Sequence, residues 1–126
     1  MNLKISVLAA IVFGFTQVVL AADLTPCDEL KQAKLDLQQT IRQVQKNHGK
    51  DKPFLLALKT SQQTWDRSVQ ANLALEFPNA SPDTYGSVLS DCLCLSRLNQ
   101  TRQRLEYLRE WLKPVEEGDV CSGSRN

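Results

Sequence analysis

The sequence predicts an all-α fold, a small antiparallel three-helix bundle with up-down-up topology that is stapled by disulfide bonds. Three segments after the first 21 residues place apolar side chains three and four positions apart, the spacing of one face of an α-helix. No segment of similar length alternates apolar and polar residues as a half-buried strand does. The connections between these segments are short, about four and ten residues, which favours antiparallel neighbours.

Residues 1–21 are expected to be a cleaved secretory signal peptide. Lys4 gives the positive start, residues 5–20 form an apolar run, and Val19-Leu20-Ala21 is a small-residue cleavage site. An uncleaved anchor is the less favoured alternative, because the run is shorter than the roughly 20 residues of a spanning helix. We therefore expect a helical domain at 22–113 and an irregular tail at 114–126, periplasmic or secreted, in a mature form that does not span a membrane.

The charge of the remaining chain is balanced. The full sequence has 15 Lys and Arg against 14 Asp and Glu, and Lys4 is the charged residue that leaves with the signal peptide. A neutral chain without a basic block lacks the electrostatic footprint of a nucleic-acid binder. It also lacks the polybasic segment that holds proteins on anionic membranes. We expect neither kind of partner.

The first helix is predicted to begin at Thr25-Pro26, where Thr25 can cap the helix, Pro26 fits the first helical position and Asp28 can complete a capping box. Its apolar face contains Leu30, Ala33, Leu37, Ile41 and Val44. It is expected to end at Asn47-His48-Gly49, with Gly49 in a left-handed cap. We interpret His48 as part of this helix end rather than as a metal ligand or a catalytic base.

The second helix is predicted to begin near Asp51-Lys52-Pro53 and to end before Pro78. Its apolar face contains Leu55, Leu58, Trp65, Val69 and Leu73, interrupted by Gln62, with Leu75 and Phe77 closing the end. A turn-rich connection, 78–87, follows. It should contain an early irregular turn.

The third helix should start firmly near Ser87 and run to about Lys113, before Pro114. One side contains Asp91, Cys94, Leu95, Leu98, Thr101, Arg102, Leu105, Leu108 and Leu112. The opposite side is apolar only at its two ends, at Leu89, Leu93, Tyr107 and Trp111. Those four residues either pack the tail or dock a partner.

The four cysteines are expected to form two disulfides, because an exported chain folds under oxidising conditions. Of three possible pairings, we favour Cys27 with Cys94, since the first and third helices of an up-down-up bundle start at the same end. Cys92 would then pair with Cys121, through a nearly extended returning tail, or with another chain. The spacing is not that of a zinc site, so we expect no metal.

The sequence contains no evident catalytic set. We find neither a nucleophile beside a base nor a carboxylate pair suited to a cleft. Cys92-Leu93-Cys94 has the spacing of some redox motifs, but on a helix the two thiols point some 200° apart. We therefore expect no enzyme activity, no cofactor and no small-molecule substrate.

Part of the chain resembles a known family. The run Leu58-Lys59-Thr60-Ser61-Gln62-Gln63-Thr64-Trp65 is similar to the Leu-Lys-x-x-Gln-x-x-Trp signature of the LprI-like lysozyme inhibitor N-terminal domain. The Tyr85-Gly86-Ser87 turn and the segment with Cys94, Leu95, Leu98, Arg102 and Leu105 resemble that family's turn and following helix. The family usually has Arg and Cys where this chain has Val69 and Leu73, so the family's disulfide between the second and third helices cannot form here.

The resemblance implies a small exported helical protein, of a family in which some members inhibit lysozyme. Trp65 should be a core anchor, Gly86 should meet a backbone requirement, and Gln62 and Arg102 should hydrogen-bond each other or a helix end. We expect a protein that binds and occludes a cell-wall lytic enzyme through the connection 79–87, with Asn79, Asp83 and Tyr85 as contacts. The alternative is an envelope interaction or assembly module without an enzyme target.

Overall fold

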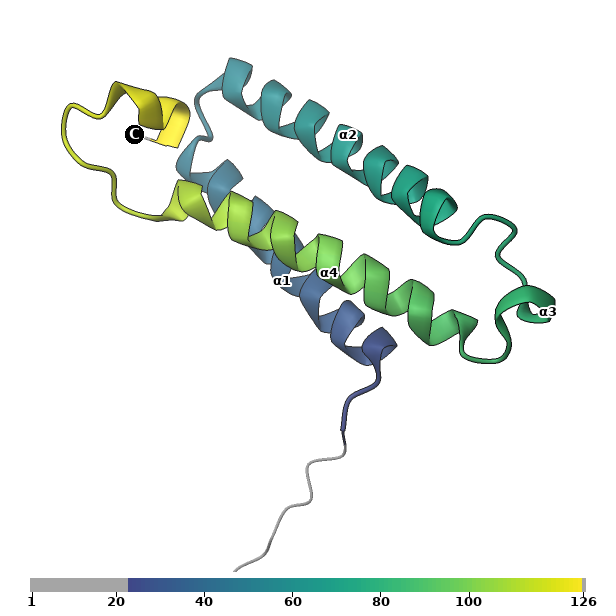
Figure 1. Ribbon diagram of the computed structural model, residues 1–126. Helices are drawn as coiled ribbons and strands as arrows, with labels where there is room; N and C mark the ends of the chain where they lie inside the picture. The colour runs from purple at the N-terminus through teal and green to yellow at the C-terminus, as the bar shows by residue number, and fades with distance from the viewer. Residues whose placement is uncertain (1–22, 126) are drawn as a thin grey trace, which may run out of the picture.

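The computed structural model describes residues 23–125, in which all regular secondary structure is helical. The long helices are α1 (Pro26–Asn47), α2 (Lys52–Glu76) and α4 (Leu89–Arg109), and a single short turn, α3 (Pro82–Tyr85), lies in the connection between α2 and α4 (Figure 1). Two 3₁₀ segments, η1 (Glu110–Leu112) and η2 (Val120–Arg125), follow α4. The predicted all-α class is confirmed, whereas the predicted signal peptide lies outside the described residues.

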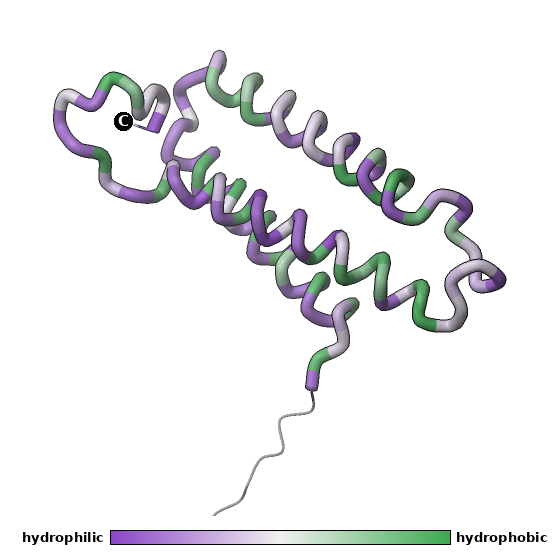
Figure 2. The backbone as a smooth tube through the Cα atoms, viewed as in Figure 1, coloured by the Kyte–Doolittle hydropathy of each residue, from purple (hydrophilic) through white to green (hydrophobic). Residues whose placement is uncertain are grey.

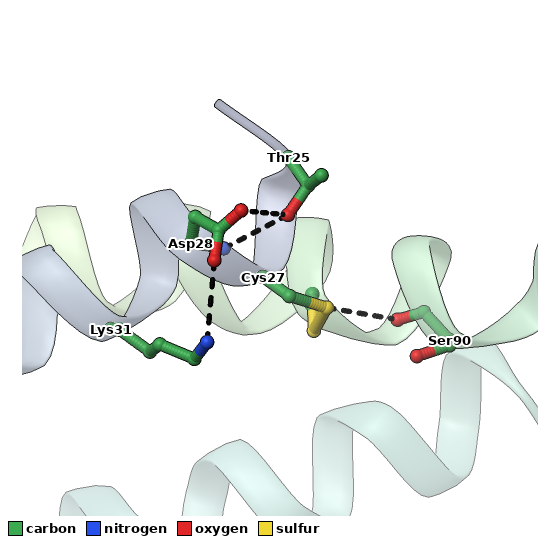
Figure 3. Close-up of a disulfide and its surroundings, with 6 residues drawn as sticks. Thr25, Cys27, Asp28, Lys31 and Ser90 are labelled. Atoms are coloured by element: carbon green, nitrogen blue, oxygen red, sulfur yellow. Dashed lines mark hydrogen bonds and ion pairs between the residues drawn. A yellow bond between two sulfur atoms is a disulfide. The ribbon is translucent and has the colours of Figure 1, made fainter. Parts of the chain in front are cut away.

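The start of α1 is capped by its own side chains. The Thr25 hydroxyl accepts a hydrogen bond from the Asp28 backbone N–H at 3.2 Å and donates one to the Asp28 carboxylate at 2.7 Å. The Lys31 ammonium lies 3.2 Å from the same carboxylate (Figure 3). These contacts satisfy a helix N–H that has no partner within the helix and place negative charge at the positive end of the helix dipole.

The contacts of Asp28 predict an acid-sensitive contribution to stability. Hydrogen bonds from Thr25 and Lys31 lower the pKa of Asp28 below its ordinary value of 3.8. A carboxyl group whose pKa is lower in the folded state stabilises the fold at pH values above its unfolded-state pKa. This contribution is lost as the pH falls through the folded-state pKa. We expect Asp28→Asn to lower the melting temperature at neutral pH and to make it less sensitive to acid. Thermal melts from neutral pH to about pH 2 test this, with Asp23→Asn as control; equal acid sensitivity of the two variants contradicts it.

The connection from α1 to α2 differs from the prediction at Gly49. The helix ends at His48, whose backbone φ is −108° and whose N–H donates to the Val44 carbonyl at 3.1 Å. The backbone φ of Gly49 is not positive, so the prediction of a left-handed cap at this residue was wrong. The His48 ring instead stacks on Phe54 at 4.0 Å, which ties the end of α1 to the start of α2. Helix α2 starts where predicted, and Asp51 caps it by accepting from the Phe54 N–H at 3.0 Å.

Helices α1 and α4 form the most closely packed pair of elements. Figure 1 shows them lying against each other, with α2 farther away. Near the starts of both helices, one apolar cluster contains Leu30, Ala33 and Leu98, with Cys94 packed against it. Toward their ends, a second cluster contains Leu37, Val44, Leu58, Leu105 and Leu108, with Ile41, Phe54, Trp65 and Trp111 around it. Because both helices pass from the first cluster to the second, they run in the same direction.

The predicted disulfide between Cys27 and Cys94 is confirmed. The two Cα atoms lie 5.0 Å apart, and the bond joins residues 67 positions apart in the sequence. It connects the first turn of α1 to α4 (Figure 3). A cross-link over so long a segment restricts the unfolded chain strongly.

The predicted second disulfide between Cys92 and Cys121 is not formed, since both residues are free thiols in the structure. Cys92 lies in the first turn of α4, whereas Cys121 lies in η2, which packs against η1 at the opposite end of α4. From Cys92 to Arg109, the last residue of α4, the helix rises about 26 Å at 1.5 Å per residue. The tail folds beside the end of α4 instead of returning along it.

The C-terminal segment is partly helical rather than irregular throughout. The Trp111 indole N–H donates to the Ser124 hydroxyl at 3.1 Å, and the Tyr107 ring meets Trp111 edge-on at 5.2 Å. Trp111 thus packs the tail, one of the two roles considered for the end residues of the third helix. Leu89 is buried at the other end of α4.

Apolar residues are distributed unevenly along the long helices. In Figure 2 the two ends of α2 and the start of α4 are largely green, whereas the middle of α4 is largely purple. In residues 23–125, no helix combines the length and the apolar character that crossing a membrane requires.

Candidate functional site

The residues predicted to contact a partner lie in the connection between α2 and α4. This segment is at the disulfide end of the molecule, because α4 starts there (Figure 1). Asn79 adopts a positive φ of 62° and Gly86 one of 74°. A side chain is strained in this region of backbone space, so the backbone requirement expected at Gly86 is confirmed. Both positions lie in the connection that turns the chain back from α2 into the antiparallel α4.

Internal contacts brace this connection. The Tyr85 hydroxyl donates to the Pro78 carbonyl at 3.1 Å, and its ring meets Phe77 edge-on at 5.5 Å. The Ser81 carbonyl accepts from the backbone N–H groups of Thr84 and Tyr85, both at 3.1 Å. Tyr85 is therefore half-buried and holds the connection together, whereas the sequence suggested it as a partner contact.

Exposed residues within and next to the connection include both polar and apolar groups. Asn79 and Asp83 are exposed, and two aliphatic residues flank them: Leu75, 79% exposed at the end of α2, and Val88, 59% exposed before α4. We call these four residues the loop surface. Val88 was not anticipated from the sequence, and Leu75 was expected to close the end of the second helix. The available signal was the position of Leu75 two residues past Leu73, which rotates it about 200° away from the buried face.

The residues of the family signature mostly build the core. Leu58 and Leu105 belong to the larger apolar cluster, and Trp65 packs against it, as expected of a core anchor. Gln62 was expected to hydrogen-bond Arg102 or a helix end, but its partner in the structure is Arg104. Its carbonyl oxygen accepts from Nε of Arg104 at 3.1 Å.

Arg102 instead lies on the surface, where its guanidinium forms an ion pair with Glu29 of α1. Ser87 is also exposed. The structure therefore brings Leu58, Trp65 and Leu105 together and leaves these two signature residues outside the cluster.

Arg104 is the buried charged residue of the described helices and was not anticipated. It is 8% exposed. Its guanidinium donates to Gln62 and, at 2.9 Å, to the Ser61 hydroxyl, and it lies 5.5 Å from the centre of the Tyr107 ring. Burial lowers the pKa of Arg104, while Tyr107 and Asp66 act in the opposite direction. The spacing of Arg97, Thr101, Arg104 and Leu108 at four, three and four residues was the signal that Arg104 shares the buried face.

Polar contacts attach α2 to α4 along its length. Besides the contacts of Arg104, Arg97 donates to the Gln70 carbonyl oxygen at 3.1 Å, and the Asn72 amide donates to Gln100 at 2.7 Å. The α2 residues ascend from 61 to 72 as their α4 partners descend from 104 to about 97, so the two helices are antiparallel. Apolar packing of α2 is concentrated at Leu58, Val69 and Leu73.

Replacing Arg104 should cost more stability than replacing Arg102, two residues away on the same helix. Arg104→Met leaves the partly buried Gln62 oxygen without its donor, which should lower the free energy of unfolding by about 1–3 kcal/mol. Arg102→Met removes a surface ion pair, worth about 0–1 kcal/mol. Denaturant unfolding of both variants measures the difference. A larger loss of unfolding free energy for Arg102→Met would contradict the conclusion that Arg104 makes the buried polar contact between α2 and α4.

The described residues contain no group of three or more His, Cys, Asp or Glu side chains placed to hold a metal ion. Comparison of the chain with protein-family models, with curated proteins and with solved structures gave no match.

Proposed function

We propose that the chain is an exported binding protein, periplasmic or secreted, that occludes a cell-wall lytic enzyme in the manner of a lysozyme inhibitor. In this proposal α1, α2 and α4 act as an up-down-up bundle that presents the loop surface at one end. The observation that carries it is the loop surface itself, where exposed aliphatic and polar groups sit on an internally braced connection. Such a protein needs no catalytic group and no cofactor.

The bracing of the connection favours binding. A loop that is already ordered loses less conformational entropy when it binds than a loose one. The Tyr85–Pro78 hydrogen bond and the Tyr85–Phe77 ring contact supply this order. Leu75 and Val88 offer apolar surface to remove from water, and Asp83 and Asn79 offer hydrogen-bonding groups beside it.

The resemblance to the LprI-like family supports the same proposal. Its signature residues Leu58, Trp65 and Leu105 meet in the apolar core, so they would preserve the scaffold while the connection determines the target. The two departures from the family pattern, Val69 and Leu73, are both buried. Apolar packing thus occupies the positions at which the family usually has Arg and Cys.

Two leucines of α2 provide a matched experiment. Leu75 belongs to the loop surface, whereas Leu56, 66% exposed, lies at the opposite end of the same helix. Against a lysozyme that binds the oxidised chain, Leu75→Ala should weaken binding about tenfold, because truncation of an interface anchor costs above 1 kcal/mol. Leu56→Ala should leave the affinity unchanged. Calorimetric titration measures both.

The polar part of the loop surface has its own matched pair. Asp83→Asn should weaken binding, whereas Glu117→Gln, the same change of charge in the tail, should not. The proposal would be contradicted if the two leucine variants changed the affinity equally and the two acidic-residue variants did as well. It would also be contradicted if no lysozyme tested bound the chain. The assembly alternative would be favoured if the chain bound no lysozyme but associated with itself, and if Leu75→Ala abolished this self-association.

A further inference from the structure

A cavity lies where α1, α2 and α4 face one another. Its volume is about 360 Å³, within the range of small-molecule sites in proteins. Its apolar wall is formed by Leu37 and Ile41 of α1 and by Trp65 and Val69 of α2. The cavity is distinct from the loop surface and has no part in the proposed function.

The cationic groups of this cavity gather at one end. Lys34 of α1 and Arg97 of α4 both line it. Lys34 follows Ala33 and Arg97 precedes Leu98, and Ala33 and Leu98 belong to the same apolar cluster near the disulfide. Lys34 and Arg97 therefore lie at the same level of the parallel α1–α4 pair.

The opposite end of the cavity is mainly apolar, with Gln62, whose side chain accepts a hydrogen bond from Arg104, as its polar lining residue. Leu37 belongs to the second cluster, and Ile41 and Trp65 pack against it. Seven residues of α1 separate Lys34 from Ile41, a rise of about 10 Å along the helix. The cavity thus has a cationic end and an apolar end about 10 Å apart.

The side chain of Gln70 holds Arg97 in place at the cationic end. A guanidinium can only donate, so the contact with Arg97 fixes the Gln70 carbonyl oxygen toward Arg97. The NH₂ group of Gln70 is then turned away from Arg97. Asp66, on the middle turn of α2, contributes the one negative charge among the lining residues, and with Lys34 and Arg97 present the formal charge of the lining is +1.

We infer that this cavity binds a small anionic amphiphile, a medium-chain fatty acid in chemical class. The carboxylate lies between Lys34 and Arg97. The acyl chain follows Leu37, Ile41 and Trp65 toward the second cluster. Charge complementarity at one end and an apolar wall at the other distinguish this ligand from a sugar or a free inorganic anion.

Three probes test both parts of the ligand. Calorimetric titration of the chain with octanoate, octanol and acetate separates the contribution of the head from that of the acyl chain. We expect octanoate to bind more tightly than octanol, and acetate, which lacks the apolar chain, not to bind detectably. Equal affinities for octanoate and octanol, or no binding of octanoate below its micellar concentration, would overturn the inference.

Substitutions of two lysines test where the carboxylate of the ligand binds. Lys34→Gln should weaken octanoate binding about two- to fivefold, the range of a partly exposed ion pair, and leave octanol binding unchanged. Lys59→Gln makes the same change at an exposed position of α2 outside the cavity and should affect neither probe. Equal effects of the two variants on octanoate would show that general charge, rather than this cavity, holds the carboxylate, and the inference would fail.

Discussion

Replacing both Cys27 and Cys94 by serine is expected to lower the free energy of unfolding by about 4 kcal/mol, the entropy cost of closing a loop of this length in the unfolded chain. The bond joins residues 67 positions apart, and without it the unfolded chain regains that freedom. Small domains have a total stability of about 5–15 kcal/mol, so a loss of this size is a large share of the margin. Equilibrium denaturation with urea, followed by circular dichroism, measures the change.

The two free thiols provide the control for this prediction. Cys92→Ser and Cys121→Ser change the same type of residue without breaking the disulfide, so each should alter stability by well under 1 kcal/mol. A reducing agent should destabilise the parent chain as much as the double substitution does, and it should leave the double variant unchanged. A loss for Cys121→Ser comparable to that of the double variant would contradict this account, because it would indicate a second disulfide in solution.

Leu108→Ala is expected to lower the free energy of unfolding by about 3 kcal/mol, within the range of large-to-small changes in a core. Leu108 is 2% exposed and belongs to the cluster that α1, α2 and α4 share. Truncation removes apolar contacts with all three helices and leaves a cavity where they meet.

The control for Leu108→Ala is Leu56→Ala, since the side chain of Leu56 is largely exposed. We expect its effect to lie within about 0.5 kcal/mol, as for most surface positions. Thermal and denaturant unfolding of the two variants should agree. Similar losses at both positions would contradict the placement of the core.

Features set by neighbouring residues could be predicted from the sequence. Thr25 and Asp51 cap the two helices that follow them, because a short polar side chain reaches backbone N–H groups two or three residues ahead. Pro26 fits the first helical position for an equally local reason. The Cys27–Cys94 bond could also be predicted, since it required only that the first and third helices start at the same end.

Features set by tertiary packing were missed. Arg104 was overlooked because a charged residue is seldom placed in a core without visible partners, and its partners, Ser61 and Gln62, lie on another helix. The Cys92–Cys121 pairing failed because the tail packs on Trp111 instead of returning along α4. Gly49 was misplaced because the turn after α1 closes through His48 and Asp51 without a left-handed residue.

Part of the candidate site could be predicted from the sequence, and part could not. Turn-forming residues located the connection between α2 and α4, and Asn79 and Asp83 are exposed there as expected. The inward role of Tyr85 depends on its contacts with Phe77 and Pro78, which spacing alone does not reveal. The exposure of Leu75 and Val88 depends on how far α2 and α4 cover each other at that end.

Inhibition of a lysozyme by the oxidised chain is the most direct test of the proposed function. The rate at which lysozyme clears a suspension of bacterial cell walls would be recorded as the chain is added in increasing amounts. We expect the rate to fall to a plateau near one chain per enzyme, and we expect Leu75→Ala to require more protein for the same effect while Leu56→Ala does not. A rate that stays constant for every lysozyme tested, up to micromolar excess of folded, oxidised chain, would contradict the proposal.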